Sequence, residues 1–223
     1  MTFTRLRIAL FLLLLVVSAC SKSAPSNSEN REAKTPPSGS VNTAASKDKI
    51  KIKTPDEQTV VEFSDTGGEP QIEFSVNGQK QILRGKSKDS SKRKYENDAN
   101  QILAEVKTDS DSFKVRTPNG KLLWKVKFND DKIKISNNEE MTSPFALKAG
   151  EQDRVKILRE ETEIGKVKFY RDRGKVKIDN PNETTLFESN TNTFLAFYGL
   201  MLMGEIPAME RYIIMVELLA RGK

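Results

Sequence analysis

From Lys49 onward, the chain is dominated by short runs in which apolar and polar residues alternate. A period of two is typical of strands that have one buried and one exposed face. Asn77-Gly78 and Pro118-Asn119-Gly120 supply turn residues between such runs. We therefore expect a mainly β fold, an antiparallel barrel or sandwich of about a dozen short strands. The expected strands are Lys49–Lys53, Thr59–Phe63, Gln71–Val76, Gln79–Leu83, Ile102–Thr108, Ser112–Thr117, Lys121–Phe128, Lys132–Ser136, Phe145–Lys148, Arg154–Arg159, Glu163–Tyr170, Lys175–Asp179 and Thr185–Glu188.

The pattern changes to a helical one over about residues 193–221. Asn192 or Thr193 is a suitable cap for a helix over Phe194–Met203. Pro207 suits the first turn of a second helix that continues to about Ala220. Both segments are expected to be helical.

The second helix is apolar on nearly every side, apart from a narrow stripe formed by Glu210, Glu217 and Arg221. A helix of this kind must be buried. A transmembrane hairpin is disfavoured, because the first apolar run is short and charges interrupt the second. The strands are therefore expected to pack around this C-terminal helix.

Residues 84–100 are strongly polar and predict an exposed, charged loop that contains Ser87, Ser90 and Ser91. A binding function for this loop is the weaker alternative.

Two Lys-rich hairpins resemble each other in sequence. Lys-Val-Lys-Phe, a turn and Lys-Ile-Lys-Ile near residue 130 match Lys-Val-Lys-Phe, a turn and Lys-Val-Lys-Ile near residue 171. If the hairpins are neighbours, their lysines form a basic stripe that could attract anionic lipids or polymers. The alternative is that the lysines protect strands from aggregation. The candidate contacts are Lys125, Lys127, Lys132, Lys134, Lys166, Lys168, Lys175 and Lys177.

The first twenty residues have the features of a secretory signal. Arg5 and Arg7 precede an apolar run over Ile8–Val17, and Ser18-Ala19 leads to the single cysteine, Cys20. This arrangement resembles the lipobox of bacterial lipoproteins. The resemblance implies cleavage before Cys20, a diacylglycerol on its sulfur and often an N-acyl chain on its amine. It also implies an extracytoplasmic location on a bacterial membrane, and Ser21 favours the outer membrane where one exists.

The chain is expected to consist of a signal peptide (1–19), a lipidated, disordered linker (20–48) and one β-rich domain (49–223). The linker is rich in Ser, Asn, Ala and Pro and contains no Ile, Leu or aromatic residue, so it cannot form a core. Removal of residues 1–19 would leave 35 basic and 31 acidic residues, because the signal contains two arginines and no acid. A net charge of +4 does not indicate a nucleic-acid partner.

Composition also limits the chemistry. The chain has no histidine, and lipidation would use its one cysteine. Triads that contain histidine, cysteine nucleophiles and the usual zinc sites are therefore excluded. No metal site, cofactor site or catalytic group is predicted, apart from the covalent lipid on Cys20.

The expected barrel and buried C-terminal helix resemble the tubby-like group, which includes LURP-one-related proteins and phospholipid scramblases. The resemblance covers about residues 49–223. It rests on Val115–Trp124, Gly165–Phe169 and the apolar Tyr212–Leu219 segment. It implies a membrane or phosphoinositide partner, although no residue matches a known headgroup site.

The resulting hypothesis is a membrane-anchored lipoprotein that acts as a non-catalytic binding or structural module of the cell envelope. Its partner would be an envelope protein, an anionic lipid or an anionic polymer. One alternative is a tubby-like barrel that binds or moves lipid. A second is a hydrolase that uses Asp/Glu or Ser/Lys. The sequence does not predict an oligomeric state.

Overall fold

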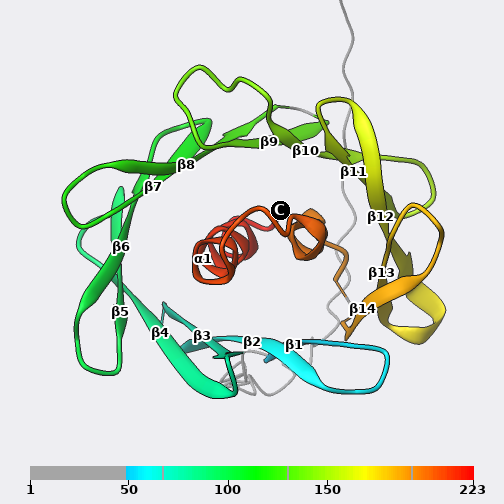
Figure 1. Cartoon of the computed structure of the whole chain (residues 1–223), viewed down its shortest axis with the longest axis horizontal. Coiled ribbons are helices and arrows are strands. Elements are labelled where there is room, and N and C mark those ends of the chain that lie inside the picture. The colour runs from blue at the N-terminus through cyan, green and yellow to red at the C-terminus, as the bar shows by residue number, and fades with distance from the viewer. Residues whose placement is uncertain (1–48, 67, 130, 192) are drawn as a thin grey trace, which may run out of the picture. The chain divides into compact units, whose positions relative to one another are not determined.

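The fold is described from a computed structural model that covers residues 49–66, 68–129, 131–191 and 193–223. These residues form a closed antiparallel barrel with a C-terminal helix (Figure 1). The predicted architecture is therefore confirmed. The predicted signal peptide, Cys20 and linker lie outside the described residues.

Fourteen strands form the wall of the barrel. Their bounds are β1 Ile50–Lys53, β2 Thr59–Thr66, β3 Glu69–Val76, β4 Gln79–Ser87, β5 Lys92–Asn97, β6 Ile102–Thr108, β7 Ser112–Arg116, β8 Leu122–Phe128, β9 Lys132–Ser136, β10 Phe145–Ala149, β11 Arg154–Arg159, β12 Thr162–Tyr170, β13 Lys175–Asp179 and β14 Thr185–Asn190.

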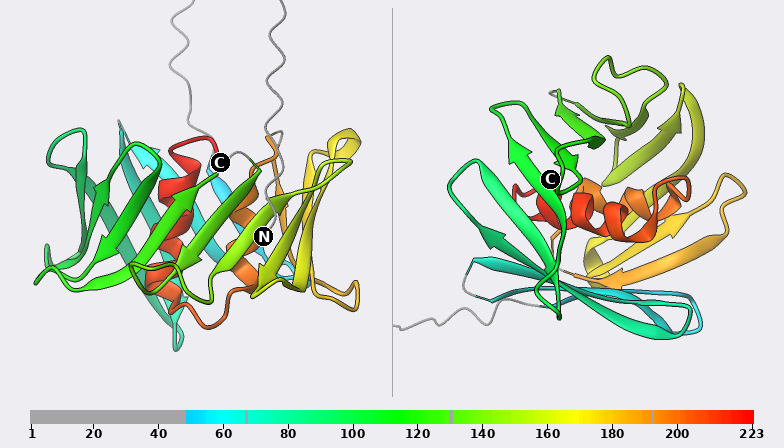
Figure 2. Two further views of the ribbon diagram at one scale, coloured as in Figure 1. Left: turned by 90° about the horizontal axis from the view of Figure 1, so that it is seen from above. Right: turned by 60° about the vertical axis from the view of Figure 1, so that its left-hand side comes forward.

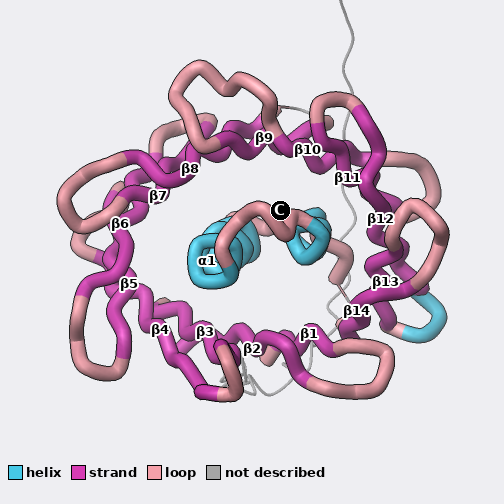
Figure 3. The backbone as a smooth tube through the Cα atoms, in the orientation of Figure 1, coloured by secondary structure: helices cyan, strands magenta, loops and turns pink. Residues whose placement is uncertain are grey.

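Each strand pairs with the strands before and after it in the sequence, and the pairing of β1 with β14 closes the ring (Figure 3). Ile52 lies opposite Ser189 in this closing pair, and Lys53 lies opposite Glu188. Every strand of the described wall therefore has a partner on both sides, and the wall has no free edge.

Two helical segments occupy the interior of the ring (Figures 1 and 2). They are the 3₁₀ helix η2, Ala196–Leu202, and the α-helix α1, Ala208–Leu219. A short 3₁₀ helix, η1, Arg171–Arg173, lies in the connection between β12 and β13.

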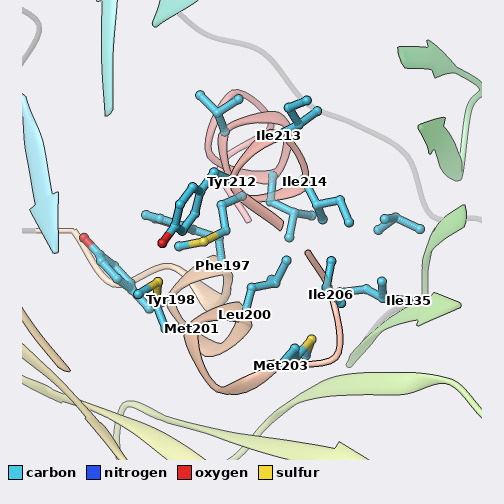
Figure 4. Packing of buried hydrophobic residues seen from close by; sticks show 14 of the residues in the cluster. Ile135, Phe197, Tyr198, Leu200, Met201, Met203, Ile206, Tyr212, Ile213 and Ile214 are labelled. Atoms are coloured by element: carbon cyan, nitrogen blue, oxygen red, sulfur yellow. The ribbon is translucent and has the colours of Figure 1, made fainter. Parts of the chain in front are cut away.

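The core consists of inward-facing strand residues packed against η2 and α1 (Figure 4). Phe63 and Phe197 meet edge to face with ring centroids 6.0 Å apart, and Phe74 and Tyr212 meet similarly at 5.1 Å. Ile213, on α1, has no exposed surface. The prediction that this helix is buried is confirmed, and its bounds differ from the expected ones by about one residue.

The prediction of a polar loop over residues 84–100 is wrong. Strand β4 continues to Ser87, and β5 occupies Lys92–Asn97. The inward face of β5 carries Tyr95, which is fully buried. It packs on Gly85, where an added Cβ would lie 2.8 Å from Pro70 and 3.0 Å from the Tyr95 ring. A single buried aromatic ring over a glycine leaves almost no apolar pattern in the sequence.

The expected first helix is shorter than predicted and is a 3₁₀ helix. Leu195 flanks its start and no side chain caps it, so the Thr193 cap is wrong, and Asn192 lies outside the described residues. At Gly199 an added Cβ would lie 2.5 Å from Leu147 and 3.1 Å from Ile157. This segment is thus fitted closely to the barrel wall. Among the described residues, no helix combines the length and apolar character needed to cross a membrane.

Candidate anionic-ligand surface

The structure places the eight predicted lysines on four strands. Lys125 and Lys127 belong to β8, and their β9 neighbours are Lys132 and Lys134. The remaining four are divided between β12 and β13, as Lys166, Lys168, Lys175 and Lys177. The residues that alternate with them, such as Val126, are buried in the core, so these lysines face outward.

The two Lys-rich hairpins are not neighbours, because β10 and β11 lie between them. These intervening strands contribute Lys148 and Lys156, which sequence reasoning missed. The register places Lys132 opposite Lys148, Lys148 opposite Lys156 and Lys156 opposite Lys166. One row of four lysines therefore connects the hairpins across four consecutive strands.

A second row of four lysines crosses β5 to β8. Lys92 lies opposite Lys107, Lys107 opposite Lys114, and Lys114 opposite Lys125. Further opposed basic pairs connect the remaining strands, and each neighbouring pair of strands from β4 to β13 has at least one. These pairs are Lys86 with Lys94, Lys127 with Lys134, Arg154 with Lys168, and Lys168 with Lys177.

We call this continuous surface the basic arc. Of the predicted lysines, Lys175 is not part of it, because Lys175 lies opposite Tyr170 and Asn190 at one end. The members are Lys86, Lys92, Lys94, Lys107, Lys114, Lys125, Lys127, Lys132, Lys134, Lys148, Arg154, Lys156, Lys166, Lys168 and Lys177.

Acidic residues beside the arc lie on β5 and β6, where Glu96 and Glu105 pair with Lys86 and Lys92 at 2.7 Å each, and in the turns that connect the later strands. Within strands β7 to β13 the acids are Glu163 and Asp179, and Asp179 is buried. Three exposed turn glutamates make ion pairs with arc lysines: Glu139 with Lys114 at 2.9 Å, Glu161 with Lys132 at 3.0 Å, and Glu183 with Lys166 at 2.5 Å. The hydrogen bond from the lysine lowers the pKa of each carboxyl.

Four members of the arc have no such partner. Lys107, Lys134, Lys148 and Arg154 lie within 4.0 Å of no carboxylate among the described residues. Each of them lies directly opposite at least one other basic residue. The uncompensated positive charge of the arc is therefore greatest on strands β6 and β9 to β11.

Facing like charges across a β-ladder is unfavourable, by roughly 0.2–1 kcal/mol for each pair. Lysines on strands are often explained as a defence against pairing with other chains at a free edge. That explanation does not apply to this wall, because the closed barrel leaves no edge among the described strands. The repeated opposition of lysines therefore needs another physical explanation.

A second charge cluster lies between α1 and the wall. Glu217 is 1% exposed, and it accepts hydrogen bonds from the Tyr95 hydroxyl at 2.7 Å, Arg93 at 2.7 Å and Arg221 at 2.6 Å. Arg221 also donates to the Thr108 hydroxyl at 2.7 Å. Burial, followed by the nearby Glu217 charge, raises the pKa of Tyr95 well above its ordinary value. This cluster compensates a buried charge and fixes α1 to β5 and β6.

A pocket of about 280 Å³ lies beside this cluster, and Ser87, Asp89, Lys92 and Arg93 are among its lining residues. Its two arginines already bind Glu217, so the pocket offers little free charge. Helices η2 and α1 occupy the barrel interior, and a mainly apolar pocket of about 390 Å³ lies beside α1, with Phe63, Val216 and Leu219 among its lining residues. Within the described residues, no group of three or more acids could hold a metal ion.

Comparison of the chain with protein-family models, with curated proteins and with solved structures gives no match. The basic arc is therefore interpreted from its own geometry.

Proposed function

We propose that this chain is a membrane-anchored bacterial lipoprotein whose barrel is a non-catalytic module that binds an anionic partner of the cell envelope. The observation that carries the proposal is the register of the basic arc, in which lysines lie opposite lysines on strand after strand. An anionic partner would remove the repulsion between these charges when it binds.

The separation of charges supports the same proposal. Positive residues occupy the outer face of the strands, where neighbouring strands hold them about 5 Å apart. Some of the acids that balance them are in exposed turns, where Glu161 has 82% of its side chain accessible and Glu183 has 64%, while others, such as Glu105 on β6, lie on the strands. Such exposed ion pairs are weak, so an anionic ligand can replace the turn carboxylates at little cost.

The anchor is a separate part of the proposal and rests on the sequence around Cys20. Two or three acyl chains on this residue would hold the chain stably at a membrane. A flexible linker of 28 residues would then span roughly 30 Å on average, which keeps the domain near the surface. The tubby-like resemblance and the hydrolase alternative stay predictions. Lipid handling in the interior has less support, because η2 and α1 occupy that space and the apolar pocket beside α1 measures only about 390 Å³.

Binding can be tested with the barrel alone, residues 45–223, because its core is built from its own residues. We expect retention on a sulfated resin, and co-flotation with vesicles that contain phosphatidylglycerol but not with vesicles of phosphatidylcholine alone. Both interactions should weaken as salt increases. Failure to bind any anionic matrix at low salt would overturn the binding proposal.

Anchoring can be tested in bacteria with the full chain and the Cys20→Ala variant. Radioactive palmitate should be incorporated into the unmodified chain and should be absent from the variant. Equal labelling of the two proteins would exclude Cys20 as the attachment site.

A further inference from the structure

The geometry points to a flexible linear polyanion, one that follows the basic arc around the barrel, as the partner. This inference rests on the proposed function, because it names the class of partner for the same surface. The class is a chain with phosphate, sulfate or carboxylate groups repeated along it.

The first reason is the extent of the arc. Opposed basic pairs connect ten consecutive strands, from Lys86 with Lys94 between β4 and β5 to Lys168 with Lys177 between β12 and β13. Neighbouring strands are about 4.8 Å apart, so the arc follows the wall for roughly 40 Å. A small anion would neutralise one or two of these pairs and leave the others unchanged.

The second reason is curvature. In Figure 1 strands β5 and β6 lie on the left of the ring, β9 and β10 at the top, and β12 and β13 on the right. The outer faces of these three parts of the ring point in different directions (Figure 3), and so do the lysines that they carry. A flat bilayer can meet only one part of such a convex surface. A flexible chain can bend with the wall and contact all three parts.

The third reason is the position of the uncompensated charges. Lys107 lies on β6, Lys134 on β9, Lys148 on β10 and Arg154 on β11. Within the described chain, none of the four has a carboxylate partner within 4.0 Å. Three of them lie on the adjacent strands β9 to β11, and Lys107 lies on β6, so the four span six strands, or roughly 24 Å, which is more than one compact anion covers. A polymer would contact them in succession and displace the turn glutamates between them.

A polymer bound in this way has two measurable properties. Its affinity increases with chain length until the chain is as long as the arc, since each further contact forms within an already bound complex. Its binding also weakens steeply with salt, because every lysine contact releases a counterion and changes the slope of log K against log salt by roughly 0.7.

The experiment compares three probes with the barrel of residues 45–223: tripolyphosphate, long-chain linear polyphosphate and vesicles that contain phosphatidylglycerol. Two variants remove opposed pairs from different parts of the arc. One is Lys107→Gln with Lys114→Gln, and the other is Lys148→Gln with Lys156→Gln. The matched control is Lys51→Gln with Lys53→Gln on β1, outside the arc, where each lysine has an acidic partner.

We expect long-chain polyphosphate to bind at least about tenfold more tightly than tripolyphosphate. Both arc variants should weaken that binding and reduce its salt slope, while the control variant leaves both unchanged. Thermal melting of each variant shows whether the barrel remains folded.

Tight vesicle binding without any dependence on polymer length would overturn the linear-polymer inference and leave the proposed function intact. The same conclusion follows if only one of the two arc variants affects polymer binding, because the chain would then contact one part of the wall. No binding to any of the three probes at low salt would overturn both.

Discussion

The outer wall of the barrel has two sectors that differ in which charges face each other across neighbouring strands. Across β14, β1 and β2, lysines face acids. Lys53 lies opposite Glu188, and Lys51 lies opposite Glu62, with its Nζ 3.1 Å from the Glu62 carboxylate. Across β4 to β13, every neighbouring pair of strands has at least one pair of opposed basic residues, and opposed basic and acidic residues, such as Lys94 and Glu105, also occur there. We call the first region the complementary sector.

The two sectors have the same inward side, since strands of both contribute fully buried residues such as Ile52 on β1 and Val126 on β8. The fold therefore does not dictate the charge pattern of the outer face. The complementary sector shows that this wall can pair its lysines with acids. The different pattern of the basic arc accordingly supports the proposed binding of an anionic partner.

The largest expected effect is the loss of stability when a buried carboxylate inside the wall is removed. Removal of a carboxylate on the outer face serves as the comparison. Glu217→Ala should lower the free energy of unfolding by about 3–5 kcal/mol, because it leaves Arg93 and Arg221 near a buried site without their carboxylate. Glu188→Ala, which removes a carboxylate on the outer face of β14 that pairs with Lys177 of the arc, should cost about 1 kcal/mol or less. Denaturant unfolding measures both values, and equal losses would contradict this distinction.

The second effect is on binding. Replacing Lys134, Lys148 and Arg154 by glutamine should weaken binding to an anionic surface by about 3 kcal/mol in total, or roughly 100-fold, at about 1 kcal/mol for each charge. The control is Lys51→Gln with Lys53→Gln in the complementary sector. It should change affinity less than threefold, which corresponds to a change of about 0.6 kcal/mol in binding free energy. Titration at constant salt provides the measurement. A similar loss in both variants would mean that net charge alone governs binding.

The third effect is on stability and has opposite signs in the two sectors. Lys148→Glu would place a carboxylate between Lys132 and Lys156, so it should raise the free energy of unfolding by up to about 1 kcal/mol. Lys51→Glu would place two acids opposite each other at Glu62 and should lower it by a similar amount. Destabilisation by Lys148→Glu would show that repulsion within the arc is negligible.

The smallest effect is that of pH. The chain has no histidine, and lysine hydrogen bonds hold the pKa values of Glu139, Glu161 and Glu183 below the ordinary 4.5. The charge of the arc and its turns should therefore stay constant from pH 8 to about pH 5.5, and affinity with it. Stability from these carboxylates is complete above their unfolded pKa and is lost as pH falls through the lowered, folded pKa. A change in affinity near pH 6.5 would reveal a titrating group other than these three carboxylates.

Much of the fold could be predicted because strand and helix patterns are local. Alternation at Lys125–Phe128 or Lys166–Phe169 marks a strand without knowledge of its neighbours. Strand β5 could not be found in this way, because Arg93 faces inward toward Glu217, which is 124 residues later in the chain. The close approach of Gly199 on η2 to Leu147 likewise joins residues that are far apart in the sequence, so local patterns do not reveal it.

The eight lysines of the candidate surface were visible in the sequence, but their arrangement was not. Which lysine faces which is set by turn lengths and by bulges such as the one between Ile157 and Leu158. A shift of one residue in either would replace a lysine pair by a lysine beside an apolar residue. Lys148 was missed because β10 also carries Ala146 and Ala149, and a single lysine does not make a pattern.

The position of α1 has a consequence for how the chain acquires its structure. Residues 208–219 follow all fourteen strands, and they supply the side chains that fill the ring. The ring itself closes only when β14, at residues 185–190, reaches β1 at residues 50–53. Contacts this distant in sequence form slowly. During synthesis, therefore, the early strands have neither a closing partner nor the helical part of the core, and the domain can complete its fold only after residues 208–219 have emerged. A chain that must cross a membrane before it folds would benefit from this delay.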